Sequence, residues 1–456
     1  MKKFLSALCL LLSTALCAQE LHIRNIQIEG LKTTKEATVL RELSFFVGDQ
    51  ITIQELHSLL EENKSNLLNQ WLFNFVDFTP IIKGSEVDIL LKVTERWYLW
   101  PYPIFEISER NFNVFWDSLR HSNFQDFSRL NYGVFLNWYN FRGRNELLKI
   151  KYRKGYKEHY LLEYDIPYLN QEKTWGAIFK TELFRMQKFH YQTTNHLLLY
   201  TLPRENLFKE HKLSLAFQYK PGINSTHKLE IEGSKMSTQY SVENPVFFLS
   251  DSLNFQYARF DYHFIQEKRD YKEYPLNGYM RELCVEFFHG IGNNYHNISL
   301  TAKAEHHHQF HPRWSVGNSI KAKTSSKDEI PYMLKQAFGF EDYLRGYEYY
   351  VIDGSQFVMT KTAVKWALLP TTEIQLPIIP WEQFSKTHFS IYFSIFADMG
   401  YVYNQEVVNN PLNNEFLMSQ GFSIDIVSYY DKLIRLEYSR NHLNETGFFI
   451  HFSNPF

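Results

Sequence analysis

The sequence contains little cysteine, and this scarcity limits how the fold can be held together. Of its three cysteines, Cys9 and Cys17 lie within residues 1–18, and only Cys284 lies in the rest of the 456-residue chain. Removal of the first segment would leave one thiol, so the mature chain would contain no internal disulfide.

Residues 1–18 have the features of a secretory signal peptide. A short basic start precedes an apolar run, Phe4–Leu16, that is too short to span a bilayer, and Ala18 precedes a suitable cleavage point. We therefore predict secretion from the cytoplasm. A lipidated Cys17 is the competing interpretation, but Leu16 stands where a lipoprotein signal has a small residue.

Beyond that segment the chain lacks any run approaching the ~18 uninterrupted apolar residues of a membrane helix. Its formal net charge is only −2, which does not support a nucleic-acid partner. Aromatic residues, in contrast, make up 17% of the chain. A secreted, aromatic-rich chain with many alternating segments is typical of a membrane β-barrel. A large secreted β-sandwich or propeller with an aromatic core is the alternative.

The chain also lacks the common catalytic motifs. It contains no G-x-x-x-x-G-K-[ST], H-E-x-x-H, G-x-S-x-G or C-x-x-C sequence. His306 and His308 share one face of a predicted strand, and His311 is near, but a metal site needs three or four convergent ligands. A polar strand near a barrel rim is the preferred interpretation, so we predict no enzyme activity, no cofactor and no metal.

Residues 19–96 are predicted to form a small α+β unit. Residues 21–30 form a strand that ends in a turn glycine, and capping boxes beginning at Thr33 and Thr52 predict two helices. Two strands follow, at residues 73–78 and 87–93, with a turn at residues 83–85 between them. This β-α-α-β-β order resembles a POTRA domain, the periplasmic module in front of outer-membrane assembly barrels. There is one copy and no internal repeat.

Residues 97–456 are predicted to form the barrel. From about Trp97 onward the helical signals stop, and segments of ten or more residues alternate between apolar and polar positions. A barrel strand needs ~10 residues, and at roughly 22 residues per strand with its connection this region supplies about sixteen strands. At the end of the chain, alternate positions counted back from the terminus are apolar, a pattern that resembles the C-terminal signal of outer-membrane barrels. These positions are Phe448, Ile450, Phe452 and Phe456.

Two motifs resemble those of the BamA/TamA superfamily, also called the bacterial surface antigen family. The first is similar to the (V/I)-R-G-(F/Y) motif and is followed by a variant of the family's glycine-pair segment; it comprises Leu344, Arg345, Gly346, Tyr347, Asp353 and Gly354. The second matches the F-x-D-x-G strand and comprises Phe396, Asp398 and Gly400. Weaker matches at 140–144, 165–167 and 274–279 fall in the family order.

The resemblance implies a contact between the two motifs. In the family, the loop that carries the arginine folds back into the barrel lumen and its guanidinium meets the aspartate of the F-x-D-x-G strand, so Arg345 is expected to meet Asp398. A guanidinium pairs best with a carboxylate. A second acidic residue is expected on the strand after the glycine pair, but Lys365 and Trp366 stand near that place. The second acceptor is therefore missing, or is replaced by Glu348, by Asp353 or by a backbone carbonyl.

The family resemblance also implies a function and a location. We expect a Gram-negative outer-membrane barrel, with its POTRA domain in the periplasm, that assists insertion, assembly or translocation of outer-membrane proteins. The expected partners are the lipid bilayer and unfolded outer-membrane proteins, with periplasmic or lipoprotein accessory factors as further candidates. A polypeptide secretion pore of the two-partner type is one alternative, although such chains usually have two POTRA units and a plug helix. A passive porin or a barrel enzyme is the other.

Overall fold

The computed structural model describes residues 20–452 with gaps at 108–111, 125–129, 171, 173, 203, 205–206, 240–243, 245–246, 249–252, 294, 328–329, 376–385, 406–409 and 429–431. The predicted signal peptide, which includes Cys17, and the terminal Phe456 lie outside the described residues. No helix in the described part of the chain is long and apolar enough to cross a membrane. The chain divides into two compact units, Met1–Arg96 and Trp97–Phe456.

The first unit is a four-stranded sheet with two helices. Its elements are β1 (Glu20–Glu29), α2 (Glu36–Leu40), β2 (Gln50–Thr52), α3 (Ile53–Leu68), β3 (Phe73–Lys83) and β4 (Glu86–Glu95). The strand order is β2-β1-β4-β3, in which β1 and β4 are parallel and the other pairs are antiparallel. The predicted β-α-α-β-β order is confirmed, with the short β2 as an addition between the helices.

Only one of the two predicted capping boxes forms. At α3 the Thr52 hydroxyl accepts a hydrogen bond from the backbone N–H of Glu55, and the Glu55 carboxylate accepts one from the N–H of Thr52. The box predicted at Thr33 is wrong, because α2 begins at Glu36 without a side-chain cap. The Glu95 carboxylate on β4 instead accepts from the backbone N–H of Thr33, so a tertiary contact replaces the local cap.

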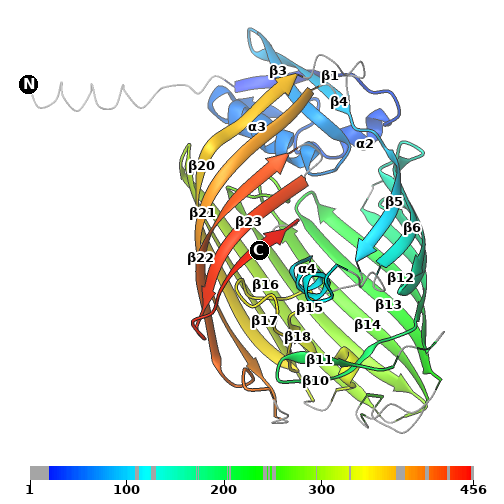
Figure 1. Cartoon of the computed structure of the whole chain (residues 1–456). Helices are drawn as coiled ribbons and strands as arrows, with labels where there is room; N and C mark the ends of the chain where they lie inside the picture. The colour runs from blue at the N-terminus through cyan, green and yellow to red at the C-terminus, as the bar shows by residue number, and fades with distance from the viewer. Residues whose placement is uncertain are drawn as a thin grey trace, which may run out of the picture. The chain divides into compact units, whose positions relative to one another are not determined.

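The second unit is built on one antiparallel sheet of sixteen strands, the number expected from the sequence (Figure 1). In spatial order these strands are β24 (Thr446–His451), β23 (Lys432–Asn441), β22 (Phe416–Ser428), β21 (Lys386–Tyr403), β20 (Gln356–Gln375), β17 (Trp314–Ser325), β16 (His296–His311), β15 (Gly278–Ile291), β14 (Asn254–Glu267), β13 (Ser225–Thr238), β12 (Phe208–Gly222), β9 (Trp175–Met186), β8 (Lys157–Ile166), β7 (Glu146–Gly155), β6 (Leu130–Phe141) and β5 (Leu99–Ile107). Figure 1 shows them tilted and wrapped around a common axis, as in a β-barrel.

The two faces of this sheet differ as the alternation predicts. On β12, Leu213 and Leu215 are exposed while Ser214 and Ala216 between them are buried. On β13, Ile231 is exposed and Glu232 beside it is only 5% exposed. The exposed positions therefore face outward, where lipid would cover them, and the polar positions face the lumen.

Four connections at one end of the barrel pack together around aromatic side chains. The connection between β9 and β12 carries the short strands β10 (His190–Thr194) and β11 (Leu197–Tyr200). The connection between β17 and β20 carries a 3₁₀ turn, η1 (Tyr332–Leu334), and the short strands β18 (Gln336–Phe338) and β19 (Ile352–Asp353). The buried members of this aromatic cluster are Phe189, Leu207, Phe208, Met236, Phe247, Phe248, Phe255, Tyr257, Phe288, Tyr295 and Tyr332. The connections thus form a packed structure of their own at the end of the lumen.

A helix that the sequence pattern did not indicate lies at the edge of the sheet. The expectation that helical signals stop at Trp97 is wrong, because Phe112–His121 forms α4. Phe115 and Leu119 recur at helical spacing and are both buried. The Asn113 side chain of α4 accepts from the Ile450 N–H at 3.0 Å and donates to the Ile450 carbonyl at 3.3 Å. The helix is therefore attached to the backbone of β24.

Candidate functional site: the lumen loop and its charged contacts

The loop that carries the R-G-Y motif, residues 339–355, is buried against the inner faces of the last strands. Leu344 is fully buried and belongs to an apolar cluster with Phe338, Val402 and Leu417. We call this segment the lumen loop. Since its apolar side chains pack on β21 and β22, burial of apolar surface holds the loop inside the barrel.

The structure brings together Arg345 and Asp398, whose side chains are both 0% exposed. Arg345 Nε donates to Asp398 Oδ2 at 2.8 Å, Nη2 donates to Oδ1, and the Arg345 backbone N–H also donates to Oδ2, at 3.2 Å. The guanidinium carbon lies 3.9 Å from the ring centroid of Phe396. The F-x-D-x-G strand therefore provides both a carboxylate and an aromatic face for this cation.

The remaining positions of the two motifs allow the lumen loop to pack closely against the barrel wall. Gly346 has φ +83°, a conformation that favours glycine, and its carbonyl accepts from Asn441 at 3.2 Å. The Tyr347 hydroxyl donates to the carbonyl of Met418 at 3.0 Å. A Cβ at Gly400 would lie 2.7 Å from Leu344 Cδ1, so only glycine lets the loop pack so closely.

The second acceptor for Arg345 is a backbone carbonyl, one of the alternatives left open by the sequence. Arg345 Nη2 donates to the Thr362 carbonyl at 3.3 Å. Lys365 does not occupy the place expected for it: its Nζ donates to the Pro275 carbonyl at 2.9 Å. The residue opposite Asp398 in the sheet register is Lys361. Lys365 therefore binds a different connection and takes no part in the contact of Arg345.

A second buried ion pair was not predicted from the sequence. Arg435 on β23 donates through Nε and Nη2 to the two oxygens of Asp425 on β22, both at 2.7 Å. The Tyr274 hydroxyl, from the connection between β14 and β15, donates to Asp425 Oδ2 at 2.7 Å. A signal was available, because β22 and β23 follow one another in the chain and pair in antiparallel register, with Ser428 opposite Lys432 and Asp425 opposite Arg435.

The other predicted site residues are the apolar positions at the C-terminus and the last two positions of the lumen-loop motif, Asp353 and Gly354. Phe448 and Phe452 are exposed on the outer face of the barrel, which agrees with an outward-facing terminal strand. Asp353 pairs with Gln336 between β19 and β18, and burial raises the pKa of Asp353 to about 6. A Cβ at Gly354 would lie 2.4 Å from Val402 Cγ1.

The histidines considered as metal ligands do not converge. His306 and His308 are exposed, whereas His307 between them is buried. Its Nε2 lies 3.4 Å from Glu305 Oε2. The strand alternation accounts for this difference, because neighbouring residues on β16 point to opposite faces.

A sixteen-stranded barrel whose lumen loop meets the wall through an arginine and an aspartate, together with a small POTRA-like unit, defines a class of outer-membrane barrel. Residues 140–438 match the Omp85 superfamily domain, and residues 21–96 match the POTRA family described as a surface antigen variable number repeat. The chain belongs to the Omp85 superfamily. Members of this superfamily insert proteins into the outer membrane or secrete them, and their POTRA domains reside in the periplasm.

Solved structures with the same fold support this assignment at the level of architecture. BamA from Haemophilus ducreyi lacking POTRA domains 1–3 is 14% identical, with a TM-score of 0.51 over 95% of this chain and 83% of that chain. CdiB from Escherichia coli is 10% identical, with a TM-score of 0.52 over 93% of this chain and 72% of that chain. No curated protein matches this chain in sequence.

Proposed function

We propose that this chain inserts other proteins into the outer membrane by adding client strands at the seam between β5 and β24. The observation that carries the proposal is the edge of β24, where Asn113 of α4 exchanges two hydrogen bonds with the backbone of Ile450. A side-chain amide offers one donor and one acceptor, the same pair that a neighbouring strand offers. Departure of α4 would leave this edge ready to pair with a client strand.

The order of the strands supports a seam at this place. Among the described strands, β5 and β24 are the two ends of the sheet. A client strand that joins β24 would keep its backbone hydrogen-bonded as it enters lipid, where an unpaired N–H or C=O is costly. Lateral addition therefore needs neither a nucleotide nor a cofactor.

The contents of the lumen favour lateral insertion over passage along the barrel axis. The lumen loop is buried among the last strands, and Tyr274 reaches Asp425 from another connection. The aromatic cluster packs the connections at one end of the barrel. A client that travelled along the axis would have to displace these buried contacts, whereas a client at the seam would displace only α4.

The POTRA unit offers a second place for an extended client. β3 is an edge strand of eleven residues, whereas the opposite edge, β2, has three. Ile81 and Ile82 are exposed on β3. An edge strand can pair with an added strand through its backbone groups, so β3 is the edge that we assign to client or accessory-factor binding in the periplasm.

Depletion of the protein tests the proposal. Quantitative proteomics of outer membranes should show a fall in several other barrel proteins, and wild-type expression should restore them. Loss of one secreted protein, with normal levels of every other barrel, would instead indicate a dedicated secretion pore. Normal levels of all barrels and all secreted proteins would refute both functions.

A further inference from the structure

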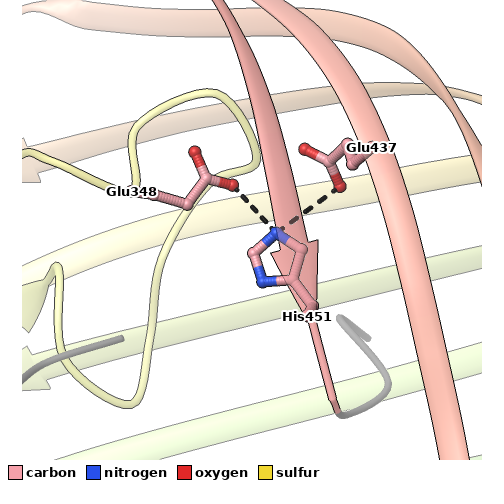
Figure 2. Close-up of side chains that lie close together, drawn as sticks. All are labelled: Glu348, Glu437 and His451. Carbon is pink, nitrogen blue, oxygen red and sulfur yellow. Dashed lines mark ion pairs between the residues drawn. The ribbon is translucent and has the colours of Figure 1, made fainter. Parts of the chain in front are cut away.

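Three side chains from three separate segments converge beside the seam. Glu348 follows Arg345 on the lumen loop, Glu437 lies on β23, and His451 is the last residue of β24. Figure 2 shows their polar groups pointing toward one another. His451 Nε2 lies 3.3 Å from Glu348 Oε1 and 3.9 Å from Glu437 Oε2, and one ligand atom from each residue fits within 4.8 Å.

This cluster is buried and its polar atoms are incompletely satisfied. Glu437 is 0% exposed, and neither of its carboxylate oxygens makes a hydrogen bond. His451 Nε2, which is directed at both carboxylates, makes no hydrogen bond either. A buried carboxylate without a hydrogen bond is costly, and a cation bound at this point would remove that cost.

The neighbouring positive groups are mostly engaged elsewhere. Arg345 and Arg435 face the cluster, but each is bound in a two-pronged contact by its own aspartate. Lys361 also faces it and lies over the Tyr343 ring, with its Nζ 4.6 Å from the centroid. The two glutamates therefore share one lysine and one imidazole, and a bound divalent cation would supply the positive charge that keeps both carboxyl groups ionised in this buried place.

We propose that Glu348, Glu437 and His451 form a binding site for a divalent transition metal ion of the Zn²⁺ type. One imidazole nitrogen and two carboxylate oxygens are ligands that Zn²⁺ accepts at about 2.0–2.2 Å. Tetrahedral ligands at that distance are about 3.3 Å apart, which matches the separation of His451 from Glu348. Small side-chain rotations would bring Glu437 into the same sphere and leave one position for water.

The bound ion would fasten the lumen loop to the two strands next to the seam. Glu348 belongs to the loop, while Glu437 and His451 belong to adjacent strands that end the sheet. If the proposed seam operates, the metal would hold β24 in register with β23 while a client pairs with its other edge. This role rests on the proposed function, whereas the existence of the site does not.

The test uses the full-length barrel purified in detergent, stripped with a chelator and then titrated with Zn²⁺. We expect one tightly held Zn²⁺ per wild-type chain by elemental analysis, and a higher temperature for the heat-dependent gel shift of the folded barrel. Glu437→Gln should weaken binding of this ion more than 100-fold, because even a group that only orients a metal ligand contributes about 10–100-fold. Replacement by Co²⁺ should give the visible absorption of a four- or five-coordinate site in wild type only.

His307→Gln is the matched control, since His307 is also a buried histidine beside a glutamate but belongs to no group of three possible metal ligands among the described residues. It should keep the tightly held ion. His451→Gln is the second variant if Glu437→Gln does not fold. Equal binding by wild type and both cluster variants, or no binding by a folded wild-type barrel, would overturn the proposal.

Discussion

The contact between Arg345 and Asp398 permits a quantitative prediction. In an Arg345→Ala variant the Asp398 carboxylate would stay buried but would lose both guanidinium hydrogen bonds, and the Thr362 carbonyl would lose its donor. Removal of one partner of a buried ion pair typically costs about 3–5 kcal/mol. The backbone N–H of residue 345 would still donate to Asp398, so we expect a value toward the lower end of this range.

The assay is the temperature at which the folded barrel loses its altered mobility on a gel run without prior boiling. A destabilisation of about 3 kcal/mol in a domain of this size lowers the midpoint by on the order of 5 °C. The control is Arg440→Ala. Arg440 Nη2 donates to Asn444 Oδ1 at 2.7 Å and both residues are exposed, so its loss should change stability by only about 0–0.5 kcal/mol.

A double variant separates the lost attraction from the penalty of an unpaired charge. Arg345→Ala with Asp398→Ala removes both charges, so its midpoint should fall by clearly less than the sum of the two single variants. Strict additivity, or a wild-type midpoint for Arg345→Ala, would refute the reasoning that this pair anchors the lumen loop.

Three further predictions follow from other contacts. Gly400→Ala should lower stability by about 1–3 kcal/mol in the same gel assay, because its Cβ would overlap with Leu344; an unchanged midpoint would contradict the close packing. Because the folded-state pKa of Asp353 is raised to about 6 from 3.8, its stabilising effect is present below pH 3.8 and is lost as the pH rises through 6. The Asp353→Asn variant should therefore show a smaller fall in midpoint between pH 4 and pH 7 than wild type, and parallel curves would argue against this titration. Asn113→Ala should increase photo-crosslinking of a client to a probe placed on β24, because α4 loses its two hydrogen bonds to Ile450, and decreased crosslinking would mean that α4 does not cover this edge.

The periodicity of the sequence and the order of its motifs were sufficient to predict the barrel and the contact between Arg345 and Asp398. Alternation predicted the barrel, since each strand buries one face, and the length of the alternating region predicted the number of strands. The contact of Arg345 with Asp398 was predicted from two motifs that resemble those of a family. The distance between the two residues along the chain could not predict it, because that distance does not tell which wall residue a loop inside a barrel contacts. In contrast, α4 was missed because its aromatic residues, such as Phe115, resemble those of the surrounding strands.

The remaining failures have one physical origin, which is that tertiary partners override local rules. Thr33 loses its capping role because Glu95, far along the chain, takes the same backbone donor. The family resemblance placed Lys365 near the second acceptor of Arg345, but the connection that carries Pro275 binds Lys365 instead. Neither partner can be identified from the residues that surround Thr33 or Lys365 in sequence.

The positions of the buried ion pairs explain why such a barrel could open at only one place. Both buried Arg–Asp pairs lie on β21 to β23 or join the lumen loop to them, and β21 has an extended ladder with each neighbour. β24, in contrast, has six residues, and its outer edge is bound by the Asn113 side chain. Two such hydrogen bonds contribute about 1–3 kcal/mol, and α4 also buries Phe115 and Leu119, whereas separating a pair of long strands breaks many bonds at once. Thermal motion would therefore release α4 far more often than it would part β21 from β22, so the edge of β24 is where a client strand would meet the least resistance.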